Sequence, residues 1–331
     1  MTNVMAANAL TRQEVGAPPS YEGECIAWLP FVTGPAAPVT IRYELSGDPD
    51  APLLILAGGI SADRHVIASE ASAACGWWEC QATVLSLYRR LAIDWVGADG
   101  ALDRPIHPED QARAILLTLD HLGIDRAAVF IGASYGAMTG MQLAAMAPER
   151  IGKLLAISAA HRAHPFVSAQ RALQRQAVEL GERLGGPGAG VALARKIAML
   201  GYRTPEEFAD RFKGPPTLAD DARVRCGAEA YLDAQGERHA ARVSAVAYRR
   251  LSESIDLHRI DPARIVIPAV FAAALDDRLI PHEDIADLAA RVPDGRFVPL
   301  PTRFGHDSFL KEQTLITALL HDFLNSLECD A

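Results

Sequence analysis

The sequence predicts an α/β fold in which a mostly parallel, doubly wound sheet is interrupted by a helical insertion. Three observations predict it. Short apolar runs alternate with amphipathic helical patterns over residues 1–159. Residues 160–258 have no strand-like runs, and the alternation resumes over residues 259–331. We therefore expect one core made of residues 1–159 and 259–331, with residues 160–258 inserted as a helical lid.

Composition narrows the class of protein. The chain has 331 residues, half of them apolar, and a formal net charge of −9. This apolar content predicts a folded core, whereas the acidic balance argues against nucleic-acid binding. No apolar stretch reaches the roughly 18–20 residues of a membrane-spanning helix, and no signal peptide is expected. The five cysteines fit neither a metal site nor a disulfide framework, so we expect reduced thiols in a cytoplasmic protein.

The first half of the core begins with an expected hairpin. Residues 24–32 and 39–45 are strand-like and flank the turn-forming sequence GPAAP. Residues 52–57 form a continuous apolar run ended by two glycines, which is typical of a strand buried on both faces. The sequence HPED at 107–110 starts a helix, because proline suits the first turn and acidic side chains favour the positive end of the helix dipole.

Further elements follow the same alternation. In the first part of the core they are strands at 91–96, 127–131 and 153–158 and a helix at 135–146. After the insertion they are a strand at 265–275, a helix at 283–292, a strand at 296–300 and a closing amphipathic helix at 310–327. An order of β, α, β, α, β predicts parallel strands joined by helical crossovers.

One motif in this framework carries chemistry. The sequence GASYG at 132–136 matches G-x-S-x-G between a predicted strand and a predicted helix. Its glycines permit a tight turn that lifts a serine hydroxyl above the sheet edge, beside a helix N-terminus that favours negative charge. Close packing of a helix on the sheet would explain the glycines but not the serine. We therefore expect Ser134 to be a nucleophile.

A nucleophilic serine needs a base and a group that orients the base, in the chain order Ser, Asp, His for this fold class. Asp277 follows the strand at 265–275, and His306 follows the next strand. The stretch between them is about one β-α-β unit, so both side chains should reach the strand ends beside Ser134. Asp276 is the alternative to Asp277.

An oxyanion hole needs two N–H donors. The backbone of Tyr135 supplies one by its position after the nucleophile. The other should come from the loop after the strand at 52–57, where two glycines permit close approach, and either Gly59 or Ile60 could donate.

Several longer segments point to a family. They are GGISADRH (58–65), GWW (76–78), GASYGAMTGMQ (132–142), AMLGYRTPEEFADRF (198–212), EAYLDAQGE (229–237) and FGHDSF (304–309). With these segments the sequence resembles the homoserine O-acyltransferases of the α/β-hydrolase superfamily, over nearly the whole chain from about residue 24. The compact length, GGISADRH and SAAHRAHP (158–165) resemble the succinyl-transferring branch more than the acetyl-transferring one. Ala137 replaces a usual glycine, and Tyr135 also departs from the family pattern.

The resemblance implies the substrates and two further site residues. Arg203 would bind the carboxylate of L-homoserine, for which a guanidinium is well suited, and Asp307 would bind its ammonium group. Without the resemblance, Arg203 would be taken as a solvated lid residue and Asp307 as a helix N-cap. The implied reaction is ping-pong transfer from an acyl-CoA, either succinyl-CoA or acetyl-CoA, through an acyl-Ser134 intermediate. No bound cofactor or metal is expected, and the family suggests a homodimer.

The anionic acyl donor needs local cations, because the chain as a whole is acidic. Arg162, Arg171 and Arg175 are candidates for coenzyme A, and Arg64 and Arg162 for a succinyl carboxylate. The alternatives are a homoserine O-acetyltransferase, a serine O-acyltransferase, a carboxylic-ester hydrolase and a protein of this fold without enzymatic activity. Arg203 together with Asp307 favours a transferase, because an esterase has no zwitterion to bind.

Overall fold

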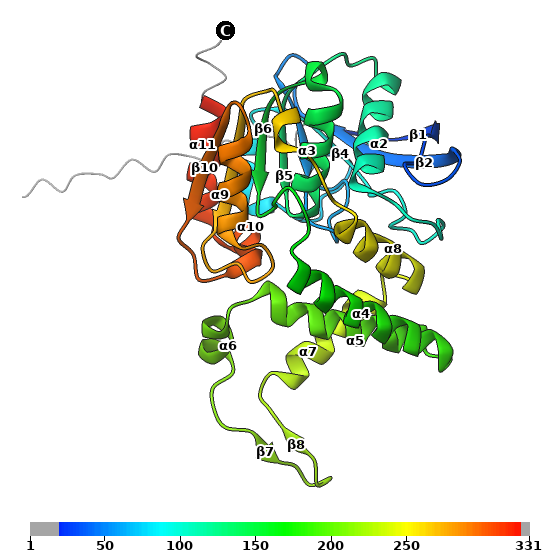
Figure 1. Cartoon of the computed structure of the whole chain (residues 1–331), viewed down its shortest axis with the longest axis vertical. Coiled ribbons are helices and arrows are strands. Elements are labelled where there is room, and N and C mark those ends of the chain that lie inside the picture. The colour runs from blue at the N-terminus through cyan, green and yellow to red at the C-terminus, as the bar shows by residue number, and fades with distance from the viewer. Residues whose placement is uncertain (1–19, 326–331) are drawn as a thin grey trace, which may run out of the picture.

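A twisted eight-stranded sheet forms the centre of the computed structural model, which describes residues 20–325 (Figure 1). Its strands are β1 (Ser20–Leu29), β2 (Ala37–Ser46), β3 (Leu53–Ala57), β4 (Arg89–Ile93), β5 (Ala127–Ala133), β6 (Ile151–Ile157), β9 (Ala269–Ala274) and β10 (Gly295–Leu300). Their spatial order is β1-β2-β4-β3-β5-β6-β9-β10. The β1–β2 and β2–β4 pairs are antiparallel and the others are parallel, so the predicted hairpin and parallel sheet are both confirmed.

The sheet is buried on both faces, which explains why its central strands lack polar alternation. Leu53 and Ile55 of β3 pack into one apolar cluster, and Leu54 and Leu56 pack into a second. The core helices that contribute to the first cluster are α2 (Pro108–His121), α3 (Tyr135–Met146) and α9 (His282–Arg291), and Leu251 from the inserted segment joins them. Those contributing to the second are α1 (Ala82–Leu85), α10 (Ser308–Lys311) and α11 (Gln313–Asn325).

A helical insertion joins β6 to β9 and lies on one side of the core, at the bottom of Figure 1. It comprises α4 (Pro165–Arg183), α5 (Pro187–Tyr202), α6 (Pro205–Arg211), α7 (Glu229–Ala240) and α8 (Ala245–Asp256). The first three helices begin with proline, as expected for a residue that has no N–H to leave unpaired. The chain enters and leaves the insertion side by side, since Ile260 N–H donates to the His161 carbonyl at 2.9 Å.

The prediction that residues 160–258 contain no strands is wrong. A short antiparallel pair, β7 (Thr217–Leu218) and β8 (Val224–Arg225), extends away from the helices. Each strand is only two residues long, and all of these residues are exposed. A sequence pattern of apolar residues therefore cannot reveal either strand.

Several boundaries also differ from prediction by a few residues, and three of these differences are larger or divide an element. The strand expected from 265 begins only at Ala269, because Pro268 has no N–H for the sheet. The strand expected at 91–96 is β4, which ends at Ile93. The closing helix is divided into α10 and α11 at Glu312, whose ψ of 67° is not helical and whose carboxylate accepts a hydrogen bond from Thr302 Oγ1 at 2.7 Å. Its last expected residues, 326–327, lie outside the described part of the chain.

Four short 3₁₀ helices complete the described structure. They are η1 (Glu79–Gln81), η2 (Pro148–Arg150), η3 (Pro262–Arg264) and η4 (Gly305–Asp307). Among residues 20–325, no helix combines the length and apolar character needed to cross a membrane.

Candidate active site

Ser134 occupies a sharp turn between β5 and α3. Its φ of 54° and ψ of −116° are unusual for a residue with a side chain, and such strain concentrates at functional sites. The flanking glycines make the turn possible. A Cβ atom on Gly136 would lie 2.0 Å from the Ala57 carbonyl oxygen, and one on Gly132 would lie 2.5 Å from the backbone of Gly136. The motif therefore reflects close backbone packing of β3, β5 and α3.

The structure brings together the serine, histidine and aspartate expected from the sequence. Ser134 Oγ lies 2.8 Å from His306 Nε2, and His306 Nδ1 lies 2.7 Å from Asp277 Oδ2. The other oxygen of Asp277 accepts hydrogen bonds from the N–H groups of Leu279 and Ile280, at 2.8 and 3.1 Å. Asp277 is buried, whereas the alternative, Asp276, is exposed. Each of the three residues follows the carboxyl end of a parallel strand.

The environment of His306 makes its ring a stronger base. Burial lowers the pKa of His306, but the charge and hydrogen bond of Asp277 and the charge of Asp307 raise it by more. The pKa therefore lies above its usual value. Tyr202 stacks on the ring, with centroids 5.9 Å apart and an interplanar angle of 22°, and Phe309 meets it edge-on at 6.1 Å. The sequence argument did not single out these two aromatic contacts, although both residues lie in segments that carry the family resemblance.

The loop expected to complete an oxyanion hole lies against the start of α3. Gly136 N–H donates to the Gly58 carbonyl at 2.9 Å, and Trp95 Nε1–H donates to the Gly59 carbonyl at 3.0 Å. Within residues 20–325, the N–H groups of Gly59, Ile60 and Tyr135 have no protein acceptor, so the choice between Gly59 and Ile60 stays open. These unpaired donors are available to an oxyanion. Trp95, which holds this loop, was not predicted.

The side chain of Tyr135, one of the departures from the family pattern, points away from the nucleophile. It is fully buried, and its hydroxyl lies 2.7 Å from Ser254 Oγ on α8. Burial raises the pKa of Tyr135 above its usual value, so the hydroxyl stays protonated and can hydrogen-bond. Tyr135 therefore links the sheet to the insertion while its backbone faces the site.

Arg203 and Asp307 lie next to each other beside His306. Arg203 Nη2 is 3.6 Å from Asp307 Oδ2, and Arg203 Nη1 also pairs with Glu207 on α6. Lys311 Nζ donates to the same Glu207 oxygen at 2.5 Å. Burial raises the pKa of Asp307, and nearby cations only partly oppose this effect. Glu207 and Lys311 were missed, although a carboxylate four residues after Arg203 at a helix start is a recognisable pairing signal.

Most cations expected to meet the acyl donor are already paired. Arg171 and Arg175 both contact Asp256, each at 2.7 Å. Arg64 pairs with Asp94 at 2.8 Å. Their charges are compensated within the protein, so the structure gives no support to these three as free anion-binding groups. Arg162 instead forms a backbone bridge with Arg259 where the insertion meets the core.

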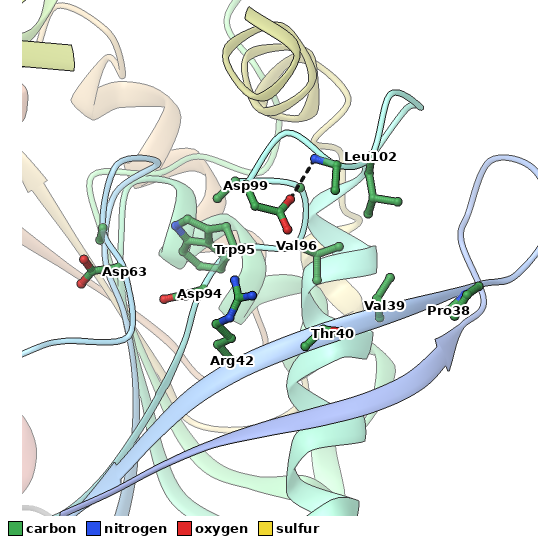
Figure 2. Close-up of a pocket in the computed structure, with 14 residues that line it drawn as sticks. Pro38, Val39, Thr40, Arg42, Asp63, Asp94, Trp95, Val96, Asp99 and Leu102 are labelled. Carbon is green, nitrogen blue, oxygen red and sulfur yellow. Dashed lines mark hydrogen bonds between the residues drawn. The ribbon is translucent and has the colours of Figure 1, made fainter. Parts of the chain in front are cut away.

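A separate cleft of about 450 Å³ lies between β2 and the loop after β4 (Figure 2). Asp63, Asp94 and Asp99 contribute carboxylates to its wall. It includes none of the residues expected to react, and its charge is unsuitable for an anionic acyl donor. Among residues 20–325, no His, Cys, Asp or Glu side chains are grouped as metal ligands would be.

Comparison with known proteins places this geometry in a family. Residues 52–313 match the alpha/beta hydrolase fold family. The chain is 49% identical over 310 residues to a homoserine O-succinyltransferase of Xanthomonas campestris pv. campestris, covering 92% of this chain and 84% of the relative. It is 36% identical over 233 residues to a homoserine O-acetyltransferase of Thermus thermophilus, covering 66% of this chain and 58% of that one.

Solved structures support the fold independently. A homoserine O-acetyltransferase from Staphylococcus aureus superposes with a TM-score of 0.76 at 22% identity, covering 93% of this chain and 95% of the other. Esterase E22 superposes with a TM-score of 0.81 at 16% identity, covering 93% and 100%. These likenesses establish the fold, and the sequence relatives establish the group within it. The chain therefore belongs to the α/β-hydrolase fold family and, within that family, to the homoserine O-acyltransferases.

Proposed function

We propose that this protein is a homoserine O-succinyltransferase, which transfers the succinyl group of succinyl-CoA to the hydroxyl of L-homoserine during methionine biosynthesis. One structural observation carries the proposal: the hydrogen-bonded series Ser134, His306 and Asp277 lies directly beside the Arg203–Asp307 pair. The three hydrogen-bonded residues can transfer an acyl group. The Arg203–Asp307 pair can bind the carboxylate and the ammonium group of an amino acid. The 49% identity to a homoserine O-succinyltransferase supports the choice of donor.

The first half-reaction forms an acyl-enzyme. His306 Nε2 accepts the Ser134 hydroxyl proton while Oγ attacks the thioester carbonyl. The N–H of Tyr135 and that of Ile60 or Gly59 stabilise the oxyanion of the tetrahedral intermediate. Its collapse breaks the carbon–sulfur bond, and the leaving thiolate takes the proton from His306. An acyl-Ser134 ester and free coenzyme A result.

The second half-reaction uses the same groups in reverse. L-Homoserine enters with its carboxylate on Arg203 and its ammonium group on Asp307, replacing their contact across 3.6 Å with two substrate ion pairs. His306 accepts the homoserine hydroxyl proton as the oxygen attacks the ester carbonyl. The proton then passes to Ser134 Oγ as the ester bond breaks, which releases O-succinylhomoserine and regenerates the enzyme.

A transferase must keep water from the acyl-enzyme, and we assign this task to residues 160–258 as a lid on a core of residues 1–159 and 259–331. Tyr202, the last residue of α5, stacks on His306, and Ser254 of α8 hydrogen-bonds to Tyr135. Both contacts support a lid that is held over the reacting groups.

The proposal includes a homodimer formed through the lid. Exposed apolar side chains follow one face of α4 and its C-cap residue at spacings of seven, seven and four residues: Phe166, Leu173, Leu180 and Leu184. Leu193 and Leu200 on the neighbouring α5 are also exposed. A contiguous apolar face of this kind favours an interface, and a two-fold axis lets one stripe pack on its own copy. The same proposal places the enzyme in the cytoplasm, where its acyl-CoA substrate is made.

Thiol release from succinyl-CoA and from acetyl-CoA, each with L-homoserine, L-serine or no amino acid, tests the function. We expect the fastest release from succinyl-CoA with L-homoserine. Equally fast release without any amino acid would favour a hydrolase and contradict the transferase. Faster release from acetyl-CoA would retain the transferase but change the donor, in line with the 36% identical acetyltransferase.

A further inference from the structure

Arg195 is a cation beside the reacting groups that the proposed mechanism leaves unused. It lies on α5 two turns before Tyr202, and its guanidinium carbon is 5.1 Å from the centre of the Tyr202 ring. The same ring stacks on His306 at 5.9 Å. Within the described part of the chain, no carboxylate pairs with Arg195, and its side chain is partly exposed. Its charge is therefore free to meet a ligand.

The ion pairs around Asp307 do not include Arg195. Arg203 and Lys311 share the Glu207 carboxylate, and Arg203 reaches Asp307 as well. Burial raises the pKa of Asp307, and the charge of Arg195 is among those that lower it, so the guanidinium acts on this site electrostatically. A zwitterionic substrate bound by Arg203 and Asp307 would leave Arg195 without a counter-ion.

We propose that Arg195 binds the terminal carboxylate of the acyl group and thereby selects a dicarboxylic acyl donor over acetyl-CoA. This inference rests on the proposed function. The two carboxyl carbons of an extended succinyl group are about 4 Å apart. Through the shared Tyr202 ring, the guanidinium carbon of Arg195 lies within about 11 Å of the centre of the His306 ring. The proposal therefore requires the flexible Arg195 side chain to extend toward an acyl chain on Ser134. An acetyl group ends in a methyl group and has nothing to pair with a guanidinium.

Donor discrimination in Arg195→Met tests the inference. With saturating L-homoserine, we expect kcat/KM for succinyl-CoA to fall about 10- to 100-fold, the effect of losing a hydrogen-bonded charge pair. The values for acetyl-CoA and butyryl-CoA, which lack the carboxylate, should change by less than about threefold. Arg195→Lys should recover part of the succinyl-CoA activity because it restores the charge without the planar fork.

Lys196→Met is the matched control. It removes one positive charge from the same helix, but Lys196 pairs with Asp233 on α7 and has no contact with Tyr202. We expect its donor preference to equal that of the wild type.

Two outcomes would overturn the inference and can be told apart. Equal loss with all three donors in Arg195→Met would mean that the residue binds the shared coenzyme A or supports the lid, and would leave the proposed function intact. Wild-type preference for acetyl-CoA, measured before any variant, would remove the proposed donor and the role of Arg195 with it.

Discussion

Replacing Gly136 by alanine should disable the turn that presents the nucleophile. The added Cβ would lie 2.0 Å from the carbonyl oxygen of Ala57 and 2.7 Å from that of Gly58, and both are backbone atoms that no rotamer change can move. The start of α3 or the end of β3 must shift, which also strains the 2.9 Å hydrogen bond from Gly136 N–H to Gly58.

The size of the effect follows from these contacts. Overpacking costs about 1–3 kcal/mol, and a weakened backbone hydrogen bond adds about 1 kcal/mol, so the free energy of unfolding should fall by about 2–4 kcal/mol. The loop that carries Gly59 and Ile60 would move with the strand. Because loss of one oxyanion donor costs about 10²–10³ in kcat, we expect a decrease of that order.

Urea unfolding followed by circular dichroism measures the stability, and thiol release from succinyl-CoA with L-homoserine measures kcat. Gly188→Ala in α5 is the matched control, because a Cβ there meets nothing within 4 Å. That variant should be at least as stable as the wild type, since alanine favours a helix over glycine. A Gly136→Ala protein with wild-type stability and unchanged kcat would refute the close-packing argument.

Three further predictions concern the nucleophile, the base and the lid surface. Ser134→Ala should lower kcat by at least about 10³-fold without loss of folding stability, as measured by thiol release and urea unfolding; retained turnover would exclude the covalent route. Activity requires neutral His306, so kcat/KM should rise with pH through its pKa. Asp307→Asn removes a charge that raises this pKa, and the midpoint of the pH profile should therefore move to lower pH; an unmoved midpoint would contradict the electrostatic role. The double variant Leu173→Glu and Leu180→Glu should sediment as a monomer with intact helical content, and an undiminished dimer would place the interface elsewhere.

The sequence predicted correctly those elements that have a distinctive residue pattern within their own segment. The apolar run of β3 and the helix that starts at Pro108 were found where expected, because a strand buried on both faces and a helix with proline in its first turn have distinctive residue patterns. The break at Glu312 was missed because it depends on a hydrogen bond to Thr302, a residue outside the helix. The β7–β8 pair was missed because its four residues are all exposed.

By itself, the sequence determined the chemistry available to this protein: a serine between glycines at a strand–helix junction, and an aspartate and a histidine after later strands. Chain order and parallel crossovers suffice to bring such residues to one edge of a sheet. Only the tertiary structure decided how they are surrounded. The stacking of Tyr202 on His306 and the free charge of Arg195 both depend on how an inserted helix packs over the core. Contacts between segments distant in the chain leave no local periodicity, and the balance of charge at the site emerges only when those segments meet.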